Sequence, residues 1–166
     1  GTVPHAAFLI AGDTVKLARA YDQFVPADAP RVILVDTFKD EAEESLSVAE
    51  ALGKNLNGIR LDTPSERGGV TAGLVREVRA RLDQAGHEHV QIVVSGGLTL
   101  DRITVLAEAG ADVFGVGSYI SRAQAIDMTM DLKEVNGKAV AKRGRIPGIT
   151  ENKRLQKIVD GKYLEA

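Results

Sequence analysis

The sequence contains no cysteine, so it can form neither a disulfide framework nor a metal site built on thiolates. Its apolar runs are short, such as the one at 90–94, and stay far below the roughly 20 residues that a membrane span requires. A formal net charge of -2, with both signs present, provides no large basic field for nucleic acid. No basic and apolar leader is recognisable. We therefore expect a soluble cytoplasmic protein that binds neither a membrane nor nucleic acid.

The length of 166 residues, with 44% of them hydrophobic, suits a single domain with a substantial core. The chain begins at Gly1 instead of Met, directly in a segment that has the character of a functional motif. This beginning suggests a processed chain, a fragment or a truncated version of a longer protein.

Four short runs rich in β-branched residues divide the sequence, and each leads into Asp, Ser or Gly, as buried parallel strands do. These expected strands lie at 31–35, 58–61, 90–94 and 112–115. Amphipathic stretches separate them, each with a glycine suited to a helix C-cap near its end, at 40–56, 70–85 and 100–109. The alternation predicts an α/β fold of parallel βα units that form part of a TIM-like barrel.

The beginning and the end of the chain depart from this alternation. Residues 4–24 are expected to be helical with a break near Gly12. The turn Asn136-Gly137 predicts a C-terminal β-hairpin, because Asn-Gly favours the tight turn between two antiparallel strands. The two strands of this hairpin are expected at 128–135 and 138–142.

The expected organisation has two parts. Residues 1–125 form the partial barrel with phosphate-binding loops, and residues 126–166 form the hairpin and the tail. The second part belongs to the same domain or returns toward a further N-terminal domain. From Glu151 onward the tail is polar, and we expect a short helix and a turn at 160–161.

Ligands of parallel α/β folds bind at the carboxyl ends of the strands. Here those ends read Asp36-Thr37, Asp62-Thr63, Ser95-Gly96-Gly97 and Gly115-Val116-Gly117-Ser118. Glycine-rich turns that open onto helices offer clustered backbone N–H groups, which suit a phosphate. Glycine would also serve merely to allow a tight turn, but two such turns in succession favour a phosphate site.

The two aspartates are candidates for binding ribose hydroxyls or a Mg²⁺ ion that bridges phosphates. The alternative for Asp36 and Asp62 is helix capping, which explains Thr37 or Thr63 equally well. Capping explains the repeated Asp less well, since one cap needs one residue.

Two basic residues complete the candidate site. Arg60 shares a strand face with Asp62, and its guanidinium requires a partner, which is either Asp36 or an anionic ligand. His5 opens a helix, where it can act as a nucleophile or bind phosphate; the alternative is an ordinary solvated histidine. The acidic run at 40–44 is interpreted as helix capping.

These segments occur in the order found in nicotinate phosphoribosyltransferases, and the chain resembles that family over nearly its whole length. The matching segments are Gly1-Thr-Val-Pro-His5, 35–41, 60–69, 94–97, 115–120 and 142–148. The resemblance implies a type II phosphoribosyltransferase with an α/β barrel and a separate, mainly N-terminal domain. It implies transfer of phosphoribosyl from phosphoribosyl pyrophosphate to nicotinate, in the salvage of NAD.

The resemblance also implies roles for individual residues. His5 matches the histidine that is phosphorylated in members that couple to ATP, and Asp36 and Asp62 match catalytic acids near the ribose and a Mg²⁺ ion. The residues expected to bind substrate are Arg60, Thr63, Ser95, Gly96, Gly97, Gly115, Gly117 and Ser118.

Members of the family carry further strands and an N-terminal domain ahead of the segment that begins this sequence. We therefore expect the chain to be inactive by itself, and to work with a missing barrel half from another polypeptide or as a homo-oligomer. Two alternatives remain: another phosphate-binding barrel enzyme, such as an aldolase or isomerase, and a non-catalytic fragment. A Schiff-base aldolase is disfavoured because no expected strand ends at Lys.

Overall fold

A computed structural model describes residues 3–150, 157–159 and 162–164. The chain divides into two compact units, Gly1–Ala123 and Gln124–Ala166, and each is described by itself. Among the described residues, no helix is both long and apolar enough to cross a lipid bilayer.

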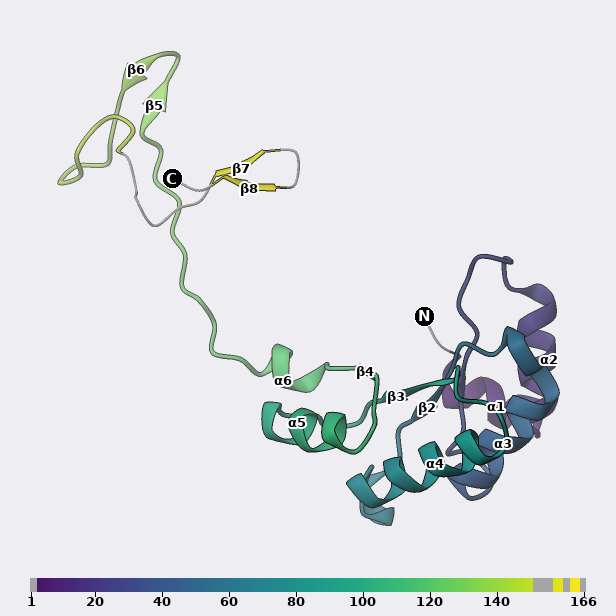
Figure 1. Cartoon of the computed structure of the whole chain (residues 1–166). Coiled ribbons are helices and arrows are strands. Elements are labelled where there is room, and N and C mark those ends of the chain that lie inside the picture. Colours follow the sequence, from purple (N-terminus) through teal and green to yellow (C-terminus); the bar gives the residue numbers. More distant parts are fainter. Residues whose placement is uncertain (1–2, 151–156, 160–161, 165–166) are drawn as a thin grey trace. The chain divides into compact units, whose positions relative to one another are not determined.

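The first unit is built on a four-stranded sheet in which every pairing is parallel and the strand order equals the chain order (Figure 1). Its strands are β1 (Val32–Leu34), β2 (Gly58–Leu61), β3 (Gln91–Val94) and β4 (Val113–Phe114). All four lie within the expected ranges, and the parallel order confirms the α/β fold predicted as part of a barrel.

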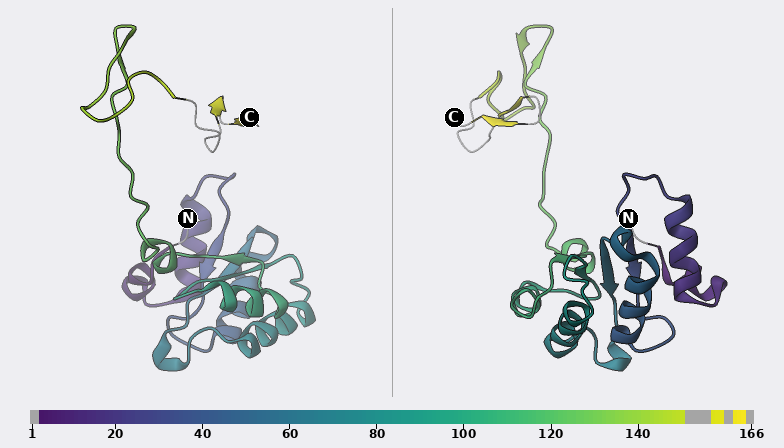
Figure 2. Two further views of the ribbon diagram at one scale, coloured as in Figure 1. Left: turned by 90° about the vertical axis from the view of Figure 1, so that its left-hand side faces the viewer. Right: turned by 45° about the vertical axis from the view of Figure 1, so that its right-hand side comes forward.

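Helices connect the strands, as expected from the amphipathic stretches. They are α3 (Glu41–Leu52), α4 (Ala72–Gln84), α5 (Leu100–Glu108) and the short α6 (Ser118–Ser121) after β4, with 3₁₀ turns η1 (Gly53–Asn55) and η2 (Ser65–Arg67). The amphipathic stretch at 40–56 is α-helical as far as Leu52, and Gly53 follows as the C-cap with φ 54°, as expected of a glycine just past the helix. Successive helices pack side by side, α3 on α4 and α4 on α5 (Figure 2).

Two further helices precede the sheet, with the expected break between them. Helix α1 (His5–Ala11) ends at Gly12, whose φ of 74° is the left-handed conformation of a helix C-cap. Helix α2 (Thr14–Phe24) begins after Asp13, whose side chain accepts a hydrogen bond from Lys16 N at 2.6 Å. Helix α2 packs against α3 and so joins the helical layer.

The core lies between the sheet and this helical layer. One face of the sheet is closed, because Ile33, Ile59 and Ile92 pair in register and are all fully buried. On the adjacent row Arg60 lies beside Val93, which is partly exposed. Side chains alternate between faces along a strand, so the Arg60 row belongs to the opposite, more open face.

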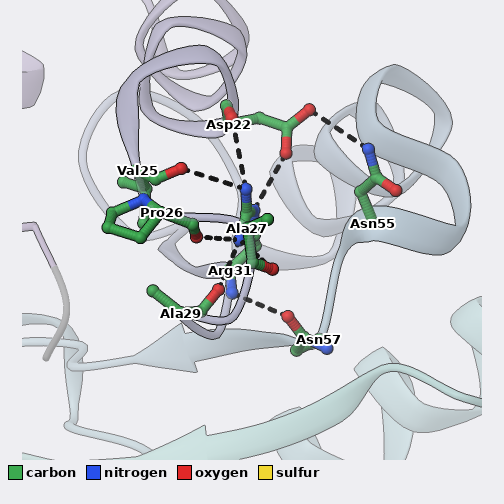
Figure 3. Close-up of polar contacts among 8 residues, drawn as sticks. All are labelled: Asp22, Val25, Pro26, Ala27, Ala29, Arg31, Asn55 and Asn57. Carbon is green, nitrogen blue, oxygen red and sulfur yellow. Dashed lines mark hydrogen bonds and ion pairs between the residues drawn. The ribbon is translucent and has the colours of Figure 1, made fainter.

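Arg31 closes the amino end of the sheet (Figure 3). Its side chain is almost fully buried, and Nε donates to Asp22 Oδ1 at 2.9 Å. The other two guanidinium nitrogens donate to backbone carbonyls of Asp22, Val25, Pro26, Ala27 and Ala29. Arg31 therefore donates to carbonyl groups at the end of α2 and in the loop before β1, where the helix leaves its last carbonyls without intrahelical partners.

The second unit contains the predicted hairpin. Strands β5 (Glu134–Val135) and β6 (Lys138–Ala139) pair antiparallel across Asn136 and Gly137, which have φ of 51° and 76°. Positive φ at both turn positions explains the Asn-Gly pair. The strands are much shorter than expected, because pairing stops after two residues on each side.

The described part of the tail forms a second antiparallel pair, β7 (Lys157–Val159) and β8 (Lys162–Leu164), which the sequence interpretation did not include. The expected turn at 160–161 and the stretch 151–156, where a short helix was expected to begin, lie outside the described residues.

Candidate functional site

The residues predicted to bind a ligand gather at one rim of the sheet. Backbone hydrogen bonds between neighbouring chain segments continue just past the strand ends. Ser95 N donates to Leu61 O at 2.9 Å, and Gly115 N donates to Val94 O at 2.8 Å. The four strands of this sheet run in the same direction, so their carboxyl ends meet at the same edge. The loops that start there begin at Asp36, Asp62, Ser95 and Gly115.

His5 and Asp36 form the first contact of the rim. His5 Nε2 lies 3.2 Å from Asp36 Oδ1 and 3.1 Å from Oδ2, which joins the start of α1 to the end of β1. An ionised carboxylate only accepts hydrogen bonds, so Nε2 donates to it and the lone pair of a neutral ring lies on Nδ1. The Asp36 side chain is fully buried, whereas 40% of the His5 side chain is exposed.

The electrostatics of Asp36 differ from those of an ordinary surface carboxylate. Burial raises the pKa of Asp36 above its usual value, and the negative charge of Asp62 acts in the same direction. The hydrogen bond from His5 opposes this shift by stabilising the charged form. A buried acid next to a half-exposed imidazole is an arrangement suited to proton or phosphate chemistry at His5.

Arg60 and Asp62 lie on one face of β2, as the two-residue spacing predicted. Their closest described approach is 3.6 Å, from Arg60 Nη2 to Asp62 Oδ2. Both side chains are partly exposed. The pair therefore presents one positive and one negative group together at the open face of the rim.

Gly96 brings the first glycine-rich turn against Asp62. A Cβ at position 96 would lie 2.8 Å from Asp62 Oδ1, and the backbone there has φ of 93°. Both facts favour glycine, because any side chain would be strained and would displace the carboxylate. The sequence offered two reasons for Gly96, phosphate binding and a tight turn; its fit beside Asp62 is a third.

Two hydroxyls at the rim are buried without a hydrogen-bond partner among the described residues: Thr37 Oγ1 and Ser95 Oγ. Most buried polar atoms in proteins are hydrogen-bonded, so such atoms indicate a place where a ligand or water completes the set. Ser95 also lies close to the second glycine-rich turn. A Cβ at position 115 would lie 3.1 Å from Ser95 Cβ, so the close approach favours glycine there.

Gly117 faces open space. A Cβ there would meet no atom of the described chain within 4 Å. Packing against the described chain therefore does not account for glycine at this position. A ligand approaching the backbone closely would account for it.

A surface pocket of about 400 Å³ connects the two glycine-rich turns. It is lined by Gly97, Leu98, Thr99, Ser118, Tyr119, Arg122 and Ala123. The sequence interpretation included Gly97 and Ser118 but missed Arg122. The sequence feature that could have identified Arg122 is its spacing. It follows Ser118 by four residues, which places both on one side of a helical turn.

Thr63 does not point into the open part of the rim. Its hydroxyl, expected to bind substrate, donates to Glu41 Oε1 at 2.8 Å, and the residue is 6% exposed. Arg67 contacts the same carboxylate, with Nη1 3.1 Å from Oε1. Glu41 was interpreted only as part of an acidic cap, but Asp40 performs the capping by accepting from Ala42 N at 3.0 Å.

Within the described residues, no group of three or more His, Asp or Glu side chains is arranged to hold a metal ion. Asp36 and Asp62 provide two carboxylates at neighbouring strand ends. Mg²⁺ commonly binds one or two protein carboxylates together with substrate phosphates and water. Of the two, Asp62 is partly exposed and open to an ion delivered with a phosphorylated substrate, whereas the Asp36 side chain is fully buried against His5.

Residues 1–131 match the family described as quinolinate phosphoribosyl transferase, C-terminal domain. The nicotinate phosphoribosyltransferase of Mycobacterium tuberculosis is 33% identical over 146 residues, covering 82% of this chain and 30% of that protein. A crystal structure of nicotinate-nucleotide pyrophosphorylase from Pyrococcus furiosus is similar with TM-score 0.73 and 44% identity. That likeness covers 90% of this chain and 38% of the other. The chain thus spans about a third of the length of these relatives.

A shorter match links the chain to a different class of enzyme. A ribulose-phosphate 3-epimerase of Cupriavidus necator is 43% identical over 56 residues, which are 32% of this chain and 23% of that protein.

Proposed function

The chain belongs to the family of the quinolinate phosphoribosyl transferase C-terminal domain, and from this membership we propose that it is part of a nicotinate phosphoribosyltransferase. The proposed reaction converts nicotinate and phosphoribosyl pyrophosphate to nicotinate mononucleotide and pyrophosphate. Nicotinate is favoured over quinolinate as the base because the Mycobacterium tuberculosis relative is named a nicotinate phosphoribosyltransferase. The observation that supports the reaction most directly is the fit of Gly96 beside Asp62, which joins an acid to a glycine-rich turn.

In the proposed site, the 5′-phosphate of the substrate binds between the two glycine-rich turns. Backbone N–H groups at 95–97 and 115–118 supply most of its hydrogen bonds. Open space at Gly117 and the unpartnered Ser95 hydroxyl support this location. Arg122 on the wall of the adjoining pocket adds a positive charge near the phosphate.

Asp62 and Asp36 then face the ribose. Departure of pyrophosphate from the anomeric carbon leaves an oxocarbenium-like centre, which a preorganised carboxylate stabilises electrostatically. Asp62, partly exposed beside Arg60, is the better placed for this role, while Asp36 is buried behind His5. Asp62 would hold Mg²⁺ together with substrate phosphates, and the ion would supply positive charge to the departing pyrophosphate.

His5 is the proposed site of coupling to ATP. Its contact with Asp36 holds the ring by Nε2, so Nδ1 is the nitrogen that would accept a phosphoryl group. The exposed part of the ring makes such an attack sterically possible.

Transfer activity is proposed to require more of the barrel than these four strands. The described sheet has β1 and β4 at its edges, and unpaired edges of this kind recruit further strands. The missing strands would come from a longer polypeptide, from a second chain, or from another copy of this one.

Titration with ribose 5-phosphate tests the phosphate site, followed through the backbone amide resonances of 95–97 and 115–118. We expect saturable shifts at these amides, and inorganic phosphate should compete. Shifts confined to other parts of the chain would contradict the proposal. A parallel assay with phosphoribosyl pyrophosphate and nicotinate or quinolinate should give no product for the 166-residue chain alone. A catalytically active monomer would refute the proposal that transfer requires further strands of the barrel.

The match to an epimerase favours a second candidate, an isomerase that acts on a sugar phosphate. It shares the phosphate-binding turns but requires no pyrophosphate. Weaker binding of phosphoribosyl pyrophosphate than of ribose 5-phosphate in the presence of Mg²⁺ would favour this candidate.

A further inference from the structure

Among the described residues, Glu41 is the most deeply buried acid that the proposed reaction does not use. It is the first residue of α3 and is 1% exposed. Burying a carboxylate is costly unless charged or hydrogen-bonding partners compensate. The cap of α3 does not require it, because Asp40 already accepts from Ala42 N and Glu43 N.

The partners of Glu41 all come from the loop after β2. Thr63 Oγ1 donates to Glu41 Oε1 at 2.8 Å, and Arg67 Nη2 donates to Oε2 at 3.2 Å. Arg67 Nη1 lies 3.1 Å from Oε1, so the guanidinium spans both carboxylate oxygens. A two-pronged contact of this kind fixes direction as well as distance.

These contacts join the two loops that carry the candidate acids. Glu41 follows the loop that starts at Asp36, and Thr63 directly follows Asp62 in the chain. Movement of Thr63 away from Glu41 would therefore shift Asp62 and its neighbour Gly96, which fits closely against it.

The far end of the same loop is held separately. Arg102 Nη2 of α5 donates to Val70 O at 2.9 Å. Between the two anchors the backbone forms a compact turn, in which Gly69 N and Arg67 N both donate to Pro64 O at 3.0 Å. The loop is thus a preformed unit whose orientation depends on its two attachments.

Buried ion pairs contribute little net stability, because desolvation offsets their attraction, and apolar residues of equal volume often do as well. Orientation is therefore the more informative reason for a glutamate here. We propose that Glu41 is a positioning residue, which holds the loop at 62–69 so that Asp62 faces the ribose and Gly96 of the first glycine-rich turn keeps its place beside it. This inference rests on the proposed function.

The test compares Glu41→Gln with Asp22→Asn in the 166-residue chain. Glu41→Gln keeps an acceptor for Thr63 but loses the charge that orients Arg67. Asp22→Asn weakens the Arg31 cluster at the opposite end of the sheet, so it controls for lost stability alone. We expect Glu41→Gln to accelerate amide exchange at Arg67 and Gly69 about tenfold and to weaken ribose 5-phosphate binding about tenfold. Asp22→Asn should change neither quantity.

A third variant provides a rescue. In Glu41→Gln the new amide N–H groups oppose the donors of Arg67, whereas Arg67→Gln would supply a carbonyl that accepts from them. The double variant should therefore recover most of the slow exchange and of the affinity, which a purely additive loss of stability would not do.

The outcomes separate the two proposals. Failure of the unchanged chain to bind ribose 5-phosphate would overturn the proposed function, while loop exchange would still decide whether Glu41 orients the loop. Binding by the unchanged chain together with unaltered exchange and affinity in Glu41→Gln would overturn the positioning role alone. Equal losses in Glu41→Gln and Asp22→Asn would also overturn it.

Discussion

At the amino end of the sheet, every nitrogen of the Arg31 guanidinium donates a hydrogen bond to Asp22 or to a backbone carbonyl (Figure 3). At the carboxyl end, by contrast, the hydroxyls of Thr37 and Ser95 have no partner among the described residues, and Asp36 is a buried acid with a raised pKa. The two ends of one sheet therefore differ in how far the protein satisfies their polar groups. The protein itself satisfies one end, and at the other end the proposed ligand would supply the partners.

The largest loss of stability should come from removing Arg31, which donates the hydrogen bonds at the amino end of the sheet. Arg31→Met would remove the donor to Asp22 Oδ1 and to several carbonyls, and we expect the free energy of unfolding to fall by about 3 kcal/mol. Urea denaturation measures this loss. Binding of ribose 5-phosphate, measured under conditions where the variant is folded, should remain unchanged. A loss of affinity larger than threefold would mean that the two ends are not independent.

The glycines of the carboxyl end should separate stability from binding. Gly96→Ala places a Cβ against Asp62 at a positive φ, so we expect a cost of about 1 to 3 kcal/mol. Gly117→Ala meets nothing and should change the free energy of unfolding by less than about 0.5 kcal/mol. Gly117→Ala should nevertheless weaken ribose 5-phosphate binding clearly, as calorimetry would show. Unchanged affinity in Gly117→Ala would contradict the proposal that the phosphate binds at this turn.

The two ends should also respond oppositely to pH. Burial raises the pKa of Asp36, so the folded chain retains a proton that the unfolded chain releases, and stability falls as the pH rises from about 4 through the raised pKa. Hydrogen bonds from Arg31 and Asn55 lower the pKa of Asp22. Its contribution is present above about pH 4 and is lost as the pH falls through the lowered pKa.

Urea unfolding across this pH range, with Asp36→Asn and Asp22→Asn, measures the two contributions. Asp36→Asn should flatten the decline toward neutral pH, and Asp22→Asn should flatten the decline toward acid. Parallel pH profiles for the two variants would contradict the comparison.

The smallest effect should come from Ser95→Ala. The variant removes a hydroxyl that has no partner in the described chain, so stability should change by less than about 0.5 kcal/mol. Ribose 5-phosphate affinity should fall only a few-fold, because backbone N–H groups supply most of the proposed contacts. A loss as large as that of Gly117→Ala would indicate that the Ser95 side chain, and not the backbone, binds the phosphate.

Much of the rim could be predicted because its position follows from local pattern. The Asp36 and Asp62 carboxylates had to share an edge once their strands were read as parallel and consecutive. The partners within that edge could not be predicted, since they join residues far apart in the chain. Gly96 fits beside Asp62, and Thr63 reaches back to Glu41, across 34 and 22 positions.

Three further features were not predicted from the sequence: the contacts of Glu41, the place of Arg122 and the length of the hairpin strands. The acidic start of α3 suited a cap so well that the second task of Glu41 had no separate signal in the sequence. Arg122 was missed because an arginine after a four-residue helix looks like any surface cation. The hairpin at Asn136 was recognised by its turn, but the length of its strands depends on pairing that no turn residue specifies.

The sheet order β1-β2-β3-β4 also has a consequence for how the chain is made. Each strand pairs with the one synthesised just before it, so no strand has to wait on the ribosome for a partner that emerges later. Contacts close over the length of a single βα unit, which keeps the entropic cost of each step low and favours rapid folding. The growing sheet has two edges at any moment: β1, which stays in place, and the newest strand. Quality control during synthesis therefore has one fixed edge to shield and one that advances with translation.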